Sequence, residues 1–127
     1  MNKARTPPSP GIGPDNADFI AAAREGRFML RWCNDCGKTH WYPRALCPHC
    51  MSANTQWKPA SGRGTVYSYS TMMRVDPPYS LAYVTLAEGP TMLTHLLGDG
   101  PYRIGMPVQV QFVASDDGTP VPMFSKA

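Results

Sequence analysis

Apolar and polar residues alternate over five short stretches in the second half of the chain. A period of two is typical of strands that bury one face of a sheet and leave the other in water. In residues 108–113, the apolar Val108, Val110 and Phe112 would share one face, and the intervening glutamines the other. The predicted strands are residues 65–72, 80–88, 91–97, 108–113 and 121–124.

Turn-forming residues separate these stretches. Glu-Gly-Pro at residues 88–90 and Asp-Asp-Gly at residues 116–118 make tight links. Residues 98–106 form a longer connection between the third and fourth strands, and a glycine-rich turn at residues 61–64 precedes the first strand. Five antiparallel strands with such an interruption suit a small OB-fold barrel. We therefore predict a mainly β protein whose C-terminal part, residues 61–127, is a five-stranded OB-fold barrel.

The N-terminal residues follow a different pattern. Residues 1–14 carry four prolines and few bulky apolar side chains, so we expect a disordered or extended tail. In residues 15–26, apolar side chains recur at helical spacing from Phe19, an Asp-Asn pair can cap the start, and Gly26 can end the helix. A helix this short is not stable alone in water. Its apolar face must dock on the barrel of this chain or on a partner protein, and the sequence leaves both open.

Four cysteines lie between these two regions. Cys33 and Cys36 form one Cys-x-x-Cys pair, and Cys47 and Cys50 form a second after ten intervening residues. Two such turns let four thiolates converge on one ion in the tetrahedral shell that zinc prefers. Short strands are predicted around them, at residues 28–32, 39–42 and 55–58. These features predict a rubredoxin-like zinc ribbon over residues 27–60. Its metal would be structural, because four thiolates leave no position for a catalytic water.

Other uses of the cysteines fit less well. A redox dithiol needs one pair in a βαβ pattern, which is not visible here. Disulfides need an oxidising compartment, yet residues 1–25 lack the order of a secretory signal and no apolar run approaches a membrane span, so we expect a cytoplasmic protein. Iron held by the same four thiolates stays open as an alternative to zinc.

We interpret His40 and His49 as exposed loop histidines. Gly37 follows the first pair but Met51 follows the second, so we expect a strained or wider second turn.

The charge distribution argues against nucleic acid as the ligand. The formal net charge of the 127 residues is +3, with eight basic and four acidic residues in 1–59 but four basic and five acidic in 60–127. A groove for single strands should be basic, because phosphate neutralisation supplies most of the affinity. Tyrosines of the barrel could nevertheless stack on bases. Single-stranded nucleic-acid binding therefore stays the alternative function.

We assign no catalytic residue. His95 has no serine or cysteine beside it at a recognisable elbow. Asp116 and Asp117 are adjacent carboxylates, but next to Gly118 they are typical of a turn rather than of an acid/base pair.

The order of these parts resembles a known family. The stretches that carry the resemblance are residues 31–37 (RWCNDCG), 43–50 (PRALCPHC), 62–68 (GRGTVYS) and 104–108 (IGMPV). Across about residues 15–125 the chain resembles the acyl-CoA-associated zinc-ribbon/OB-fold proteins, long described as a domain of unknown function. Members of that family are similar in assembling with thiolases, thiolase-like aldolases or MaoC-type hydratases. The resemblance implies a non-catalytic accessory subunit that assists complex assembly and acyl-CoA binding, with the catalytic residues on the partner.

Two further expectations concern contacts. The segment 74–79 joins the first two barrel strands, where OB folds often contact ligands. We expect Arg74 near a CoA phosphate and Tyr79 on adenine or on the partner; a rigid turn with an exposed arginine is the alternative. The three tryptophans cluster in sequence around the ribbon and are expected to cover the metal site, with one of them a candidate interface anchor.

Overall fold

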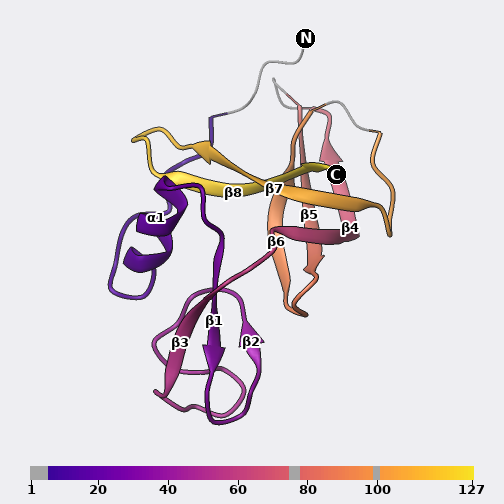
Figure 1. The fold of residues 1–127 in the computed structure, drawn as a ribbon. Helices are drawn as coiled ribbons and strands as arrows, with labels where there is room; N and C mark the ends of the chain where they lie inside the picture. Colours follow the sequence, from indigo (N-terminus) through magenta and orange to yellow (C-terminus); the bar gives the residue numbers. More distant parts are fainter. Residues whose placement is uncertain (1–5, 75–77, 99–100) are drawn as a thin grey trace.

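The computed structural model describes residues 6–74, 78–98 and 101–127 of the chain (Figure 1). A single helix is followed by strands alone among these residues. Within them no helix is long and apolar enough to cross a membrane. The elements are α1 (Ala17–Arg24), β1 (Met29–Cys33), β2 (Thr39–His40), β3 (Thr55–Pro59), β4 (Arg63–Met72), β5 (Tyr79–Leu86), β6 (Thr91–Leu96), β7 (Pro107–Ala114) and β8 (Pro120–Lys126).

The first three strands form a small sheet of their own. Its order is β2-β1-β3, and both pairings are antiparallel. β1 is central because the Cys-x-x-Cys turn at its end leads directly into β2, while β3 returns along its other side after the second pair of cysteines. This is the predicted ribbon, with strand ends that differ by at most two residues from the predicted ends.

The last five strands close into a barrel in the order β4-β5-β6-β8-β7. The predicted OB-type barrel is thereby confirmed. Four of its pairings are antiparallel, and the fifth, β6 with β8, is parallel and rests on one residue pair, Leu96 with Phe124. A register shift between Val66 and Ser68 marks a bulge in β4, which increases strand twist and helps a short sheet to close.

One hydrophobic core joins the helix, the ribbon and the barrel. Phe19 of α1 lies at its centre, with ring centroids 5.1 Å from Trp41, 5.9 Å from Phe28 and 6.4 Å from both Trp57 and Phe112. The other buried apolar side chains of this core come from α1, the ribbon, inward positions of the barrel strands, and Met106 just before β7. The helix therefore docks on this chain itself, which decides between the two alternatives that the sequence left open.

Asn16 joins the N-terminal segment to the helix and the ribbon. It stands at the N-cap of α1 but makes no side-chain capping bond. Its side chain instead accepts a hydrogen bond from the Gly13 N–H (2.8 Å) and donates to the Gly11 carbonyl (3.0 Å) and the Tyr42 hydroxyl (2.8 Å). Residues 6–14 have no regular secondary structure, yet Pro7 is buried and its carbonyl accepts a hydrogen bond from the Asp116 N–H.

Candidate metal centre

The four cysteine sulfurs meet at the tip of the ribbon. They all lie within 4.8 Å of one another, with 3.5 Å between the Sγ atoms of Cys33 and Cys50 and 3.7 Å between those of Cys36 and Cys47. All four thiols are free rather than joined in disulfides. Four sulfurs at the zinc–sulfur distance of about 2.3 Å from a tetrahedral centre would stand about 3.8 Å apart. The observed spacing therefore fits a single tetrahedral ion.

The two cysteine turns share one backbone pattern. In the first, the Gly37 N–H donates to the Cys33 carbonyl and the Cys33 N–H to the Lys38 carbonyl; in the second, the Met51 N–H donates to the Cys47 carbonyl and the Cys47 N–H to that of residue 52. Gly37 has φ of 73° and Met51 has φ of 65°. A side chain in this left-handed region is disfavoured, so the predicted strain in the second turn is present at Met51.

Replacing Met51 with glycine should stabilise the ribbon. The substitution removes the penalty of about 1–2 kcal/mol for a side chain in the left-handed region. Part of this gain is offset, because glycine has more conformational entropy in the unfolded chain. We expect Met51→Gly to raise the free energy of unfolding by about 1 kcal/mol in urea titrations of the metal-loaded chain. The matched control, Gly37→Ala, should lower it by a similar amount. A Met51→Gly chain no more stable than the parent would contradict this account.

The environment of the thiols favours binding of a cation. The Cys36 N–H is the main cause that lowers the pKa of Cys33 to about 7, against the effect of burial. The Ser52 N–H lowers the pKa of Cys50, but the other three sulfurs together with burial raise it to about 12. Four crowded sulfurs cannot all carry charge unless a cation compensates them. The donor set fits zinc, which when bound would be held by Cys33, Cys36, Cys47 and Cys50 and would stabilise the fold of the ribbon.

A polar cluster holds the two turns together. Asp35 accepts hydrogen bonds from the Ser52 hydroxyl and from Asn54 Nδ2 (3.1 Å), and these bonds lower its pKa. Asn34 adds a backbone bond to Asn54 (2.9 Å) and a side-chain bond to the same residue (3.0 Å). Sequence reasoning missed this cluster, because short polar residues next to cysteines give no periodic signal.

The histidines near the metal centre differ from each other. His49 is exposed, as predicted. The prediction for His40 is wrong: it lies on β2, paired with Arg31 of β1, and is 3% exposed. Burial lowers its pKa, and the nearby His49, Arg31 and Arg44 lower the pKa further. A strand of two residues is too short to show an alternating pattern, so the sequence did not show that His40 faces the interior. Neither histidine belongs to the four-sulfur cluster.

Two family models match the chain. Residues 21–56 match "ChsH2, rubredoxin-like zinc ribbon domain", and residues 57–113 match "ChsH2, C-terminal OB-fold domain". A solved chain described as "Ltp2-ChsH2(DUF35) aldolase" has a TM-score of 0.78 and 34% sequence identity, over 93% of this chain and 98% of that one. The chain belongs to the ChsH2 (DUF35) family. The resemblance found in the sequence is therefore confirmed, and the four cysteines lie within the residues that match the zinc-ribbon model.

Two curated relatives of this ChsH2-family chain are named as subunits of enzymes. A probable enoyl-CoA hydratase alpha subunit of Thermomonospora curvata is 35% identical over 127 aligned residues, which are 94% of this chain. The chain spans only 40% of the length of that relative. The benzoylsuccinyl-CoA thiolase subunit BbsA of Thauera aromatica is 26% identical, over 98% of this chain and 96% of its own length.

The other candidate residues of the ChsH2-family chain lie away from the ribbon in sequence and fold. Arg74 is exposed just after β4, and Tyr79 begins β5 and stacks on His95 with ring centroids 5.4 Å apart. Residues 75–77 of the predicted contact segment lie outside the described residues. Asp117 Oδ1 accepts hydrogen bonds from the Ser115 hydroxyl (2.8 Å) and the Thr119 N–H (3.0 Å), which is the geometry of a turn former.

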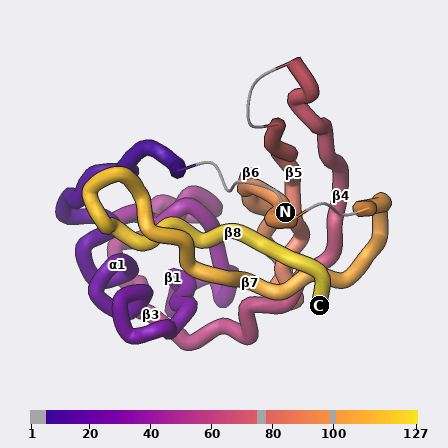
Figure 2. The backbone as a smooth tube through the Cα atoms, turned by 90° about the horizontal axis from the view of Figure 1, so that it is seen from above, coloured from indigo at the N-terminus to yellow at the C-terminus, as the bar shows by residue number. Residues whose placement is uncertain are grey.

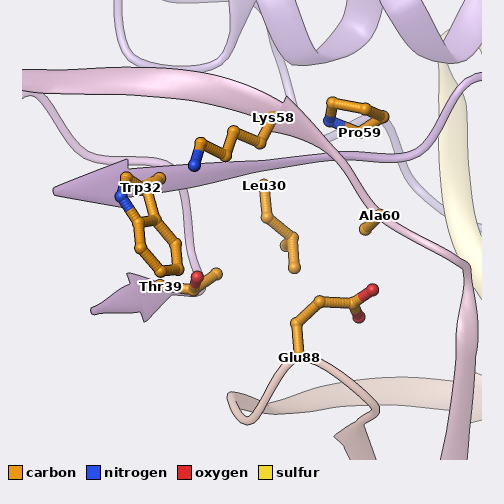
Figure 3. Close-up of a pocket in the computed structure, with 7 residues that line it drawn as sticks. All are labelled: Leu30, Trp32, Thr39, Lys58, Pro59, Ala60 and Glu88. Carbon is orange, nitrogen blue, oxygen red and sulfur yellow. The ribbon is translucent and has the colours of Figure 1, made fainter. Parts of the chain in front are cut away.

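The tryptophans serve the junction between ribbon and barrel. We expected them to cover the metal site, but Trp41 and Trp57 pack on Phe19 in the shared core. Trp32 lines a cavity of 210 Å³ between the ribbon and the β5–β6 turn, where Lys58 Nζ lies 4.3 Å from its ring centroid (Figure 3). Glu88 borders the same cavity and accepts a hydrogen bond from the Ser61 N–H (2.9 Å). Residues so distant in sequence carry no joint signal before the fold is known.

Proposed function

We propose that this chain is a non-catalytic, zinc-binding accessory subunit of an enzyme that processes CoA thioesters. The partner would be a thiolase-superfamily thiolase or aldolase, or a MaoC-type hydratase, and it would carry the catalytic residues. The main observation that supports this proposal is the four-cysteine centre in a ChsH2-type fold. Four thiolates around one ion stabilise a domain and leave no position for a reacting water. Relatives of the chain that are described as hydratase, thiolase and aldolase components support the choice of partner.

The proposal includes a cytoplasmic location. The four free thiols support it, because a reducing compartment keeps cysteines available to a metal. The CoA thioester would be a ligand of the assembled complex rather than of this chain alone.

Co-expression with candidate catalytic subunits tests the accessory role. The tagged chain should retain a thiolase, aldolase or hydratase subunit in a fixed ratio through purification at moderate salt, and full activity on CoA thioesters should need both chains. A chain that stays alone with every such subunit, yet binds single-stranded oligonucleotides in a salt-dependent way, would sink the proposal in favour of the nucleic-acid alternative.

We further propose that the hairpin end at Arg74 and Tyr79 contributes to acyl-CoA binding in the complex. Arg74 is exposed beyond the end of β4, where its guanidinium can reach a phosphate, and Tyr79 offers an aromatic ring at the start of β5.

Replacing Arg74 with alanine should weaken CoA binding without unfolding the barrel. A lost hydrogen bond to a charged group corresponds to about 1.5 kcal/mol, so we expect KM for the CoA thioester to rise about tenfold in the assembled complex, with kcat little changed. Arg63→Ala, at the opposite end of β4, serves as the matched control and should leave KM within about twofold. An unchanged KM in the Arg74→Ala complex would remove the phosphate role.

A further inference from the structure

The outer face of β4, β5 and β6 exposes large apolar side chains in one place. Tyr67 is 67% exposed, Tyr83 49% and Leu93 57%. Tyr83 pairs with Leu93 of β6 on one side and with Ser68 on the other, beside the bulge that leaves Tyr67 outward. Because directly paired residues share one face of a sheet, Tyr83 and Leu93 lie side by side on the outer face, and the exposed Tyr67 precedes Ser68, the partner of Tyr83. We call the surface of these three residues the tyrosine face. Figure 2 shows β4 and β5 on the side of the barrel away from α1 and the ribbon.

This surface carries no formal charge. Residues 64–72 and all of β5 and β6 contain no Asp, Glu, Lys or Arg, although the whole chain has 21 such residues, 12 basic and 9 acidic. Interface cores are depleted in charged residues and enriched in tyrosine relative to the rest of the protein surface. The composition of these strands is thus that of a surface covered by another molecule.

An apolar cavity opens beside the tyrosine face. It has a volume of 200 Å³ and is lined by residues of β6, β8, α1 and the segment after β2, among them Leu93, His95, Pro122, Phe19 and Trp41. Its lining likewise contains no Asp, Glu, Lys or Arg. A pocket at the margin of a flat apolar face is the feature that receives a large anchoring side chain in protein interfaces.

We infer that the tyrosine face and its adjoining cavity form the docking surface for the catalytic protein subunit of the complex. This inference rests on the proposed function and adds the place of contact. The absence of charge on this surface favours a protein as the binding partner. An uncharged surface does not attract nucleic-acid phosphates or anionic lipid electrostatically. It does complement the uncharged, apolar interface core of a folded protein. The partner would bury the three exposed side chains and place one large apolar residue in the cavity.

The test compares two leucine substitutions in the complex recovered by co-expression. Leu93→Arg places a charge where the tyrosine face meets the cavity, and Leu46→Arg places the same charge on an exposed leucine of the ribbon loop. Thermal unfolding and zinc content establish that each variant is folded. Affinity for the purified catalytic subunit is measured by calorimetry, and hydrogen exchange of the parent complex maps the protected strands.

We expect Leu93→Arg to weaken binding at least about tenfold and Leu46→Arg to change it less than about twofold, with exchange protection in β5 and β6. Unchanged binding by Leu93→Arg, or protection confined to the ribbon, would overturn the docking surface and leave the accessory role intact. If the free chain is a dimer that Leu93→Arg converts to a monomer, a second copy covers the face and the inference is wrong. If the parent chain binds no catalytic subunit at all, the proposed function itself fails.

Discussion

Replacing Cys47 with serine will abolish tight zinc binding and unfold the ribbon. The fully buried Cys47 supplies one of four thiolates, and its backbone also forms the second cysteine turn. Structural zinc contributes on the order of 10 kcal/mol to the folding of small modules, far more than the total stability of a ribbon this size. We expect the metal content to fall from one ion per chain to below about 0.1, with loss of the near-ultraviolet circular dichroism of the ribbon tryptophans.

His49→Ala is the matched control for this prediction. His49 lies between two ligands in sequence but is exposed and outside the four-sulfur cluster. Its replacement should leave one metal ion per chain and the dichroism unchanged. Metal analysis of the parent chain also distinguishes zinc from iron, because iron held by four thiolates is coloured. A Cys47→Ser chain that keeps a full complement of metal and a native spectrum would refute the structural role of the site.

Truncating Phe19 to alanine should cost about 3–5 kcal/mol of stability, the usual cost of removing a buried phenylalanine. Phe19 is 3% exposed and contacts aromatic rings of the ribbon and of β7, so the vacated space cannot be filled by one local movement. Urea unfolding of the zinc-loaded chain would measure the loss.

Asp18→Ala, one residue earlier in α1 and exposed, is the control and should change stability by less than about 1 kcal/mol. A Phe19→Ala loss no larger than that of the control would mean that the helix is peripheral to the core. A large loss with separate ribbon and barrel transitions would mean that the two parts fold independently.

The sequence predicted those features that repeat or that depend on local chemistry. Strand alternation located the barrel strands, because a sheet with one wet face imposes a period of two. Cysteine spacing located the metal centre, because two short turns suffice to converge four sulfurs. Met51 was also foreseen as the strained position, since it stands where the first turn has Gly37.

Features that depend on packing between distant segments could not be predicted from the sequence. His40 was taken as exposed because nothing in the sequence shows that it pairs with Arg31 and faces the interior. Trp41 and Trp57 were assigned to the metal, since their packing on Phe19 becomes visible only when three separate segments meet. The docking of α1 on its own chain could not be predicted either, because the sequence of an amphipathic helix does not show which surface the helix will cover.

The shared core changes how the two family models should be understood. Their boundary falls between residues 56 and 57, inside β3, where Gln56 pairs with Trp32 and Trp57 with Arg31. A cut at that point would sever a strand and strip Phe28 and Leu30 of their barrel neighbours. The ribbon and the barrel are thus matched by separate family models but share one core in this chain, and we expect a stably folded fragment to need both parts together with α1.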